Sequence, residues 1–476
     1  MWAAETETET TVSMAAICAV KPSTRSRLGG KVGLPPAKAA TTETLARSPL
    51  AVGLLYNFAK VTVIRVMWDQ KVSNMNFPKS RSYFAATTAF RTGEDSPRKF
   101  LERCIEVFEA QEARIGAFVE TNFDGARKAA DDASDRWKSA SPLSAIDGMP
   151  VGIKDIMETA DMGTEQGSPL FTGWQGGRDC AAVVALREAG AVIVGKTVTT
   201  EFAATHPGGT CNPWDLERTP GGSSSGSAAS VVAGMLPAAL GTQVIGSILR
   251  PASYCGCFGY KPSIGGINRG GSFDGFSQSC SGVLAATLDE TWSVGREISA
   301  RAGGDPGYPG ISGPLDTPAA KMPQRIALLE TAGWEKATNE AKQALIVARE
   351  QLASSGIEIA DKSSADSVAL VDQAIADAMP LSMSINAWEG HWPLNTYARD
   401  MDRTKLSESA QGRLDQAKKM TQEEYYGLLM ERERVRGIYA NLADGFDLCI
   451  SLTAPGAAPK GLGWTGDPSF VVPGSL

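Results

Sequence analysis

The stretch that decides the fold is Thr219–Ser263, TPGGSSSGSAASVVAGMLPAALGTQVIGSILRPASYCGCFGYKPS. It opens with a cluster of glycine and serine at 221–227 and reaches a second polar turn at Gly246 and Ser247. Glycine lets a backbone pass close to a ligand, and serine supplies hydroxyls that relay protons or attack carbonyls. A flexible linker has this composition too, but an apolar periodic run follows here. The stretch is therefore predicted to form a binding or catalytic site and not a flexible linker.

Two local motifs fit the start of this stretch. The spacing from Gly221 to Gly226 matches a phosphate-binding loop, but Ser227 stands where that loop needs lysine. The same residues fit the G-x-S-x-G elbow of a hydrolase, with Ser224 as nucleophile. That elbow needs a later histidine, and of the two histidines only His391 follows it. A serine esterase using Ser224 and His391 is therefore the weaker alternative.

A second distinctive stretch is GMPVGIKDI at 148–156, in which Lys154 ends an apolar, strand-like run. A lone lysine at the end of a strand is ordinarily a surface residue. A lysine enclosed by apolar walls, however, loses part of its preference for the charged form. The neutral amine can then accept a proton from a serine. Lys154 is thus a candidate base in a protein with little histidine.

Three motifs together point to one family. Lys154 lies in GMPVGIKD, Ser223 in TPGGSSSGSA and Ser247 in GSILRP, with Ser223 69 residues after Lys154 and Ser247 24 residues after Ser223. In order and spacing, the chain resembles the amidase signature family, whose catalytic triad is Ser-cisSer-Lys. The resemblance extends from about Tyr83 to the C-terminus.

The resemblance implies a role for each matching residue. Ser247 would attack the amide carbonyl and carry the acyl group. Ser223, after a cis peptide bond, would pass the proton between Ser247 and Lys154, the final base. An oxyanion hole aims backbone N–H groups at developing negative charge, and the resemblance assigns it to Val244, Ile245, Gly246 and Ser247. Supporting positions are Gly222, Ser224 and Ser225. The resemblance implies no metal and no cofactor.

The segment before the nucleophile departs from the common family pattern, G-[ST]-D-x-G-G-S-[IV]-R-x-P. Gln243 replaces the acid, Ile245 replaces a glycine, and the arginine comes one place later, at Arg250. Some members of the family resemble this version, with GTQ before the serine and RPA after it. A β-branched side chain at 245 restricts the backbone of the expected oxyanion hole. We therefore expect an effect on rate more than on reaction type, and a catalytically impaired remnant is one alternative.

Composition limits the remaining possibilities. The 476 residues are 43% hydrophobic, enough for a large core and one to three domains. The net charge of −7 gives no reason to expect nucleic acid or an anionic membrane as partner. Eight cysteines lack the density of a disulfide scaffold and fit a reducing cytoplasm. We read Cys255 and Cys257 as small core residues. The expected partner is a small amide substrate, and a homodimer is left open.

The two ends of the chain look different from the middle. Residues 1–74 are polar and rich in Pro and Gly, which predicts an extension that is disordered or not native, with translation starting at Met75 as a hypothesis. Within it, the apolar run Leu50–Trp68 contains Lys60 and Arg65, each costing about 2.5–3.5 kcal/mol at a bilayer centre, so no membrane span is expected. Residues 75–476 form the expected amidase domain. Because family members continue into further strand and helix, we expect a truncated C-terminus.

Periodicity predicts alternating helices and strands. Three helices are expected: one that starts at Pro97 with Ser96 as its cap, one at 123–137 and one at 180–189. Besides the strand that ends at Lys154, strands are expected at 191–194, 325–329 and 446–452. The class is α/β, and the resemblance implies a single large mixed β-sheet sandwiched by α-helices. Residues 334–439 read as mostly amphipathic helix. Their aromatics, Trp388, Trp392 and Tyr397 among them, are expected to be packing residues.

The predicted function is hydrolysis of a linear carboxylic amide to an acid and ammonia or an amine. An alternative within the family is the A subunit of glutamine-dependent tRNA amidotransferase. Gln243 and Leu249 fit that alternative poorly, and the acidic chain offers no patch for tRNA. The substrate stays open among aliphatic amides, aryl amides, indole-acetamide-like compounds and ureides such as biuret.

Overall fold

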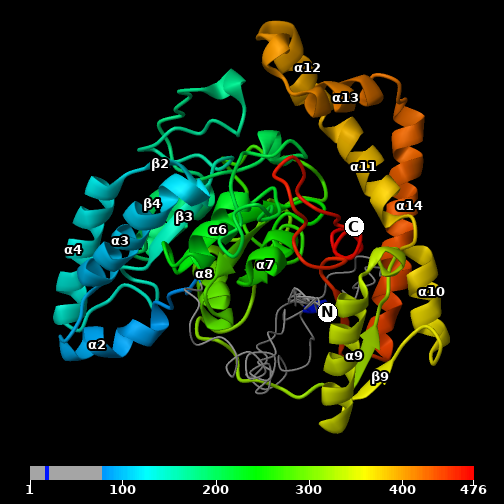
Figure 1. The fold of residues 1–476 in the computed structure, drawn as a ribbon, viewed down its shortest axis with the longest axis horizontal. Coiled ribbons are helices and arrows are strands. Elements are labelled where there is room, and N and C mark those ends of the chain that lie inside the picture. Colours follow the sequence, from blue (N-terminus) through cyan, green and yellow to red (C-terminus); the bar gives the residue numbers. More distant parts are fainter. Residues whose placement is uncertain (1–16, 21–77) are drawn as a thin grey trace, which may run out of the picture.

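The computed structural model describes residues 17–20 and 78–476 (Figure 1). Of the expected extension, only Ile17–Val20 is described, as strand β1. The hypothesis of a start at Met75 and the apolar run Leu50–Trp68 lie outside the described residues. The described residues therefore comprise most of the predicted amidase region and one short strand before it.

A six-stranded mixed sheet forms the first part of the molecule. Its order is β2-β4-β3-β5-β7-β6, and the central strand β3 runs parallel to both neighbours, β4 and β5. The other pairs are antiparallel. Strands β3, β4, β5 and β7 are buried along their whole length, which explains their nearly continuous apolar sequences. The strands are β2 (Phe118–Thr121), β3 (Pro150–Lys154), β4 (Val192–Thr197), β5 (Ala238–Gln243), β6 (Phe258–Tyr260) and β7 (Cys280–Ala285).

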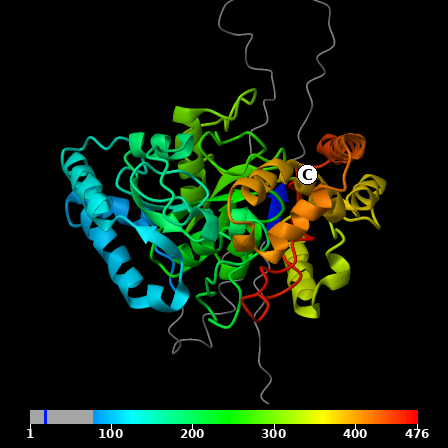
Figure 2. The ribbon, with the colours of Figure 1, turned by 90° about the horizontal axis from the view of Figure 1, so that it is seen from above.

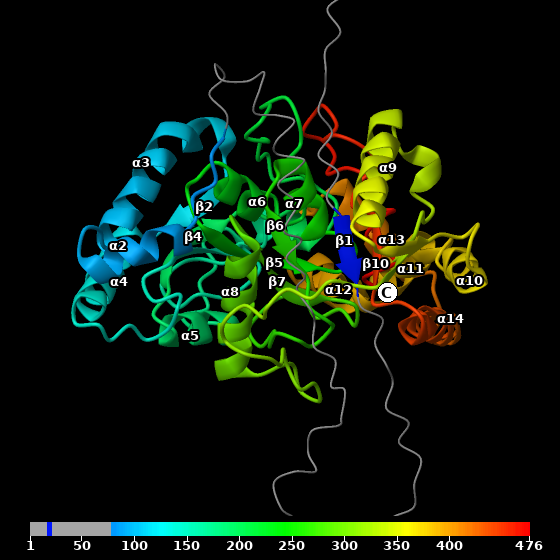
Figure 3. The same ribbon diagram turned by 90° about the horizontal axis from the view of Figure 1, so that it is seen from below.

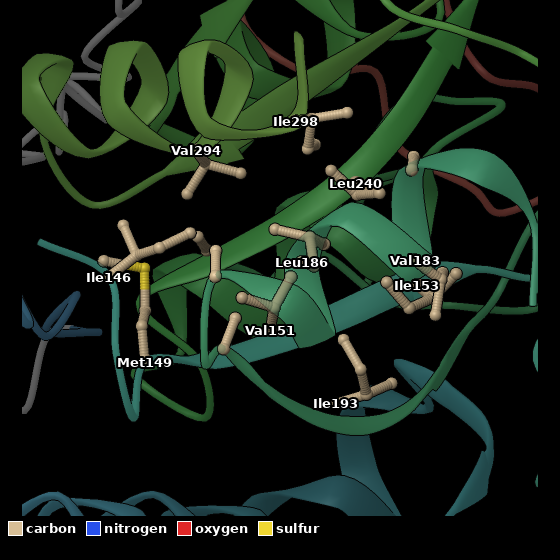
Figure 4. Packing of buried hydrophobic residues seen from close by; sticks show 14 of the residues in the cluster. Ile146, Met149, Val151, Ile153, Val183, Leu186, Ile193, Leu240, Val294 and Ile298 are labelled. Atoms are coloured by element: carbon tan, nitrogen blue, oxygen red, sulfur yellow. The ribbon is translucent and has the colours of Figure 1, made fainter. Parts of the chain in front are cut away.

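Helices cover both faces of this sheet. Val192 and Val194 of β4 pack with α3, α4 and α6 on one face, while Val151, Ile153 and Leu240 pack with α5 and α8 on the other (Figure 4). The Ser96 side chain accepts the N–H of Lys99, which confirms the predicted cap of α3. The helices are α2 (Thr87–Thr92), α3 (Pro97–Ile115), α4 (Phe123–Lys138), α5 (Ala181–Glu188), α6 (Ser225–Val232), α7 (Leu249–Cys255) and α8 (Leu288–Ala302).

A second, four-stranded sheet has the order β1-β10-β8-β9, and Figure 3 shows its strands β1 and β10 side by side. The strands β10, β8 and β9 run parallel, and β1 pairs antiparallel with β10. The α/β class with a mixed sheet between helices is confirmed, but these strands form a sheet of their own instead of extending the first. Its strands are β8 (Arg325–Leu328), β9 (Glu358–Ala360) and β10 (Leu448–Leu452), and the nearby helices are α9 (Asn339–Ser354), α10 (Asp366–Ala374), α11 (Ala378–Glu389), α12 (His391–Asp400), α13 (Glu408–Ala417) and α14 (Gln422–Ala440).

Helices α3 and α4 of the first part and helices α10 and α14 of the second part lie at opposite ends of the molecule (Figures 1 and 2). One helical stretch among the described residues, Asp366–Glu389, is long and apolar enough by composition to cross a membrane. Its side chains Val368, Val371 and Ile385 pack in the core beside Cys449 of β10. These side chains of the stretch therefore pack on the second sheet, while Leu370 is exposed.

The last residues of the chain join the two parts. They run between α7 and the helices around α11 and α14 (Figure 1). Phe470 and Val472 are buried in the two clusters of the second sheet, and Ile245 of the first part packs against the cluster that holds Val472. The segment 244–247, expected to form the oxyanion hole, thus lies where the two parts meet.

Candidate active site

Lys154 is the last residue of β3 and has no exposed surface. Its Nζ lies 2.7 Å from Ser223 Oγ and 2.9 Å from Thr242 Oγ1, and donates hydrogen bonds to both. Thr242 is near the end of β5, which runs parallel to β3, so both side chains come from the carboxyl ends of parallel strands. In open α/β sheets this edge is where ligands bind. The structure thus places Lys154 and Ser223 in contact at that edge.

Burial determines the charge of Lys154. Removal from water disfavours the ammonium and lowers the pKa of Lys154 to about 7, while the carboxylate of Asp274 opposes this shift. No ion pair to Lys154 is present among the described residues. A large fraction of the amine is therefore neutral near pH 7 and able to accept a proton.

The loop that carries Ser223 is fixed from several sides. The peptide bond between Gly222 and Ser223 is cis, as the resemblance implies. The Gly222 carbonyl accepts Arg250 Nη2 at 2.7 Å, and the Ser223 carbonyl accepts the N–H of Thr200 at 3.2 Å. At Gly226 a Cβ would lie 2.1 Å from a main-chain oxygen just before β2, so the loop approaches its neighbour too closely for any side chain.

Ser224 and Ser225 attach the start of α6 to the sheet. The Ser224 N–H donates to the Ser247 carbonyl at 3.3 Å, and the Ser224 hydroxyl donates to the Thr242 carbonyl at 3.4 Å. Ser225 Oγ donates to the carbonyl of Val198 at 3.3 Å. These contacts are structural, and Ser224 is fully buried.

The structure does not bring together the pair that an esterase would need. His391 begins α12 and stacks on Trp392 at a centroid distance of 5.8 Å. Ser224 instead contacts Ser247 and Thr242, near the end of β5. The esterase alternative therefore receives no support from the geometry.

Ser247 lies half-buried two residues before α7. Its carbonyl accepts the Ser224 N–H, which places its backbone beside the turn that carries Ser223. Its hydroxyl makes no hydrogen bond to the residues that the structure describes. The structure therefore contains the link from Lys154 to Ser223, whereas Ser247 is joined to this pair through the backbone alone.

The main-chain N–H groups of Val244, Ile245, Gly246 and Ser247 find no acceptor in the described part of the chain. At Gly246 a Cβ would lie 2.5 Å from Val471, so this turn is also packed too tightly for a side chain. Ile245 does not adopt a positive φ, its side chain packs in the second core, and its carbonyl accepts Ser475 Oγ at 3.1 Å. The β-branched residue is thus accommodated in the turn, and four unpaired donors remain.

The two other departures from the common pattern have separate structural roles. Gln243 Oε1 accepts the N–H groups of Ile248 at 2.9 Å and Leu249 at 3.0 Å, and its Nε2 donates to Ser475 Oγ at 2.9 Å. Gln243 therefore caps α7 and ties the C-terminal segment to the turn. Arg250 instead donates to neutral oxygens, those of Gly222 and Thr465, so no carboxylate at 243 is needed to pair it.

The sequence of the chain matches a known protein family and several named proteins. A sequence model of the family described as Amidase matches residues 99–469. The chain belongs to this family. It is 39% identical over 241 residues to a protein of Chloroflexus aggregans named as the A subunit of glutamyl-tRNA(Gln) amidotransferase, covering 49% of each chain. A protein of the same name from Anaeromyxobacter is 40% identical over 212 residues, covering 43% of this chain and 41% of that one. The chain spans about half the length of the curated relatives it matches.

Solved structures, two of them described as amidases, share the fold over most of the chain. One described as an amidase superposes with a TM-score of 0.68 at 24% identity, covering 80% of this chain and 83% of that one. The native peptide amidase of Stenotrophomonas maltophilia gives 0.63 at 22% identity, covering 81% and 87%. A vestigial complex said to reveal the origins of an s-triazine catabolic enzyme gives 0.70 at 25% identity, covering 83% and 88%.

The sequence motifs alone do not reveal several residues at this candidate site. Thr242 holds the amine of Lys154, Thr200 holds the backbone of Ser223, and Thr465 holds Arg250. Of these, only Thr242 carried a signal, because it precedes Gln243 in the GTQ segment. The other two are brought in by loops whose course the sequence does not show.

The cap formed by Gln243 gives a first prediction. Gln243→Ala removes the acceptor of the buried Ile248 N–H and the partly buried Leu249 N–H, and loss of a helix cap costs about 0.5–2 kcal/mol. We expect a lower midpoint of urea unfolding and a several-fold fall in amidase activity. Gln422→Ala, at the exposed start of α14, is the matched control and should change neither. Equal stability of the two variants would contradict the role of Gln243.

Proposed function

We propose that this amidase-family protein hydrolyses a linear carboxylic amide through a covalent acyl-serine. The proposal rests on one observation above all: a buried lysine, with its pKa lowered to about 7, is hydrogen-bonded to Ser223 next to the turn of Ser247. A base of this kind suits chemistry near neutral pH. No other described lysine combines a hydrogen bond to a serine hydroxyl with a position beside unpaired backbone donors.

In the proposed reaction, Ser247 Oγ attacks the amide carbonyl and passes its proton to Ser223 Oγ. The Ser223 proton moves in turn to the neutral Nζ of Lys154, over the 2.7 Å contact. The N–H groups of Val244 to Ser247 stabilise the oxyanion, and one such donor is worth about 2.7–4 kcal/mol. The same path then returns the proton to the leaving nitrogen as the C–N bond breaks. Water attacks the acyl-serine by the reverse relay and releases the acid.

A substrate panel tests this proposal. The full chain is incubated with an aliphatic amide, an aryl amide, biuret and L-glutamine, and released ammonia is measured. We expect turnover of at least one amide other than glutamine, with an acyl adduct on Ser247 detectable by mass spectrometry after rapid acid quench. Absence of turnover and of any adduct, for every amide, would contradict the proposal and favour a catalytically impaired remnant.

A second candidate is the A subunit of a glutamine-dependent amidotransferase, because the curated relatives carry that name at 38–40% identity. In that function the same acyl-serine chemistry releases ammonia from glutamine for a partner protein. The panel separates the two candidates, since this subunit would release ammonia from L-glutamine alone. A homodimer and a cytoplasmic location stay predictions.

A further inference from the structure

Asp274 is a fully buried aspartate in the loop 261–279, between β6 and β7. One carboxylate oxygen accepts the Ser272 hydroxyl at 2.6 Å, and the other accepts the Ser279 hydroxyl. It forms no ion pair with any residue that the structure describes. A carboxylate inside a protein is unfavourable unless hydrogen bonds and a positive charge together replace its hydration. The two hydroxyls supply hydrogen bonds, so the positive charge has to come from another side chain.

The loop that carries Asp274 is attached to the chain just after Lys154. The Phe273 N–H donates to the carbonyl of Ile156 at 2.9 Å, and Ser272 pairs with Met157 in a β-bridge. These contacts involve the second and third residues after Lys154, at the end of β3. Asp274 therefore has a fixed place close to the candidate base.

A row of buried polar side chains leads from Lys154 to Asp274. Lys154 Nζ lies 2.9 Å from Thr242 Oγ1, and Thr242 of β5 pairs directly with Ser281 of β7. Directly paired residues of antiparallel strands share a face of the sheet, with Cβ atoms about 4.5–5.5 Å apart. Ser279, which donates to Asp274, comes two residues before Ser281. All five side chains belong to residues that are at most 1% exposed, so the row runs through the interior.

Two positions in this row have unused hydrogen-bonding capacity. The Ser281 hydroxyl is buried and has no partner among the described residues. An ammonium has three N–H donors, whereas the hydrogen bonds of Lys154 Nζ in the described part of the chain are those to Ser223 and Thr242. Protonation of the amine therefore creates a donor and a charge that Ser223 and Thr242 do not satisfy.

The charges next to Lys154 leave Asp274 as its counter-charge. Lys196 Nζ pairs with Asp155 Oδ1 at 3.1 Å, and both side chains are fully buried, so this pair is neutral as a whole. The carboxylate that acts on Lys154 is that of Asp274, which opposes the lowering of the Lys154 pKa by burial. A carboxylate at this place favours the ammonium form of Lys154.

The cations next to Asp274 are Arg269 and Lys261. Arg269 Nε pairs with Asp305 at 2.6 Å, and Arg269 Nη1 donates to the main-chain carbonyl of Asp274 at 3.1 Å. Lys261 Nζ lies 3.9 Å from Cys280 Sγ, and burial raises the pKa of that thiol. Neither cation donates a hydrogen bond to the Asp274 carboxylate, which is therefore available to act on Lys154.

Two further charges come from the helices that pack on the loop 261–279. Glu389 of α11 accepts the Ser277 N–H at 2.7 Å, and Arg432 of α14 donates to the Ser277 hydroxyl at 2.6 Å. The two charges have opposite signs and meet at Ser277. They therefore contribute little net charge at Asp274.

We propose that Asp274 is the counter-charge of the proton relay: its carboxylate stabilises the ammonium that forms on Lys154 while Ser247 is acylated, through the hydroxyls of Thr242, Ser281 and Ser279. The proposal rests on the proposed acyl-serine function and deepens it. A fixed charge aimed at a charge that develops during reaction lowers the barrier without reorganisation. Asp274 is a positioning residue in this role. It keeps its charge throughout, and the proton that Lys154 receives returns to the leaving nitrogen.

A pH profile of the Asp274→Asn variant tests the proposal. The rate of Ser247 labelling by a fluorophosphonate is measured from acid to alkaline pH, because this step needs the relay but no amide turnover. Loss of the carboxylate makes the ammonium less favourable. We expect the acid limb to move down by about one pH unit or more and the alkaline plateau to fall about three- to tenfold, since one unit of pKa corresponds to a factor of about ten.

The control for this profile is Glu358→Gln, at an exposed pair with Arg325, which should change neither the limb nor the plateau. If Asp274→Asn does not fold, Asp274→Ser removes the same charge with a smaller side chain and should give the same shift. A structural defect would lower the rate equally at every pH. An acid limb that stays in place would therefore overturn the proposal.

A double-mutant cycle separates failure of this proposal from failure of the proposed function. Urea unfolding is measured at pH 6 and pH 9 for the unmodified protein, Lys154→Met, Asp274→Asn and the double variant. At pH 6 Lys154 is mostly an ammonium, because its pKa is about 7. We therefore expect Asp274→Asn to lower the unfolding midpoint more when Lys154 is present than in Lys154→Met. At pH 9 Lys154 is neutral, and the two decreases should be equal. Equal decreases at both pH values would overturn the proposal, whether or not the protein turns over amides.

Discussion

Ser247→Ala is expected to abolish labelling by a fluorophosphonate probe and to lower amide hydrolysis by at least about 10⁴-fold, as removal of the nucleophile does in serine hydrolases. The hydroxyl of Ser247 has no hydrogen-bond partner in the described protein and lies half-buried beside four unpaired N–H groups, so it is free to attack a ligand. Its removal leaves the neighbouring contacts in place, since only the Ser247 carbonyl is used by Ser224. Gel fluorescence and released ammonia measure the two effects.

Two further variants identify the nucleophile. Ser224→Ala and His391→Ala should both keep fluorophosphonate labelling, because Ser224 anchors α6 to β5 and His391 stacks on Trp392. Loss of labelling in His391→Ala alone would instead favour the esterase alternative. Labelling that survives in Ser247→Ala would show that another residue attacks, and would remove the proposed mechanism.

The sequence could point to the candidate catalytic edge because its motifs are local. Lys154 ends an apolar strand, Ser223 lies in a Gly/Ser turn, and Ser247 precedes a helix, all of which short windows of sequence record. The structure adds that Lys154 and Ser223 are in contact. Ser247 is joined to them only by the hydrogen bond from the Ser224 N–H to the Ser247 carbonyl. The spacing of the motifs in the sequence does not predict this hydrogen bond.

Other parts of the site depend on contacts between distant segments and were not predictable in this way. Residues 334–439 read as amphipathic helix with little chemistry, yet Tyr397 and Arg413 of this region line a pocket together with Gln166 and Phe202. The same holds for the second sheet. Strand β8 looks like any other buried strand in sequence, and nothing local states that it pairs with β10 more than 100 residues later. Side chains whose role depends on such docking carry no sequence signal of their own.

Lys154→Met is expected to lower kcat by about 10²–10⁴-fold, the range for loss of a general base, while the Ser247 hydroxyl remains. In the unmodified protein the base must be neutral, and its pKa is about 7. The rate should therefore fall about tenfold per pH unit below pH 7 and be level above it. Lys362→Ala, at an exposed lysine paired with the half-buried Glu330, is the control and should keep the full rate. A pH optimum on the acid side of neutrality would contradict a lysine base.

The same pKa shift also makes a prediction about stability. Lys154 has its pKa lowered from an ordinary value of 10.5 to about 7 in the folded protein. Between these two values the unfolded chain binds one proton more, so the free energy of unfolding rises with pH across that window. Below pH 7 both states are protonated, and the folded protein carries the full cost of a buried ammonium. Lys154→Met removes this cost, so the Tm difference between variant and unmodified protein should be more positive at pH 6 than at pH 9. A Tm difference that does not change with pH would mean that Lys154 keeps its ordinary pKa, and the relay through Ser223 would then have no neutral amine to receive its proton.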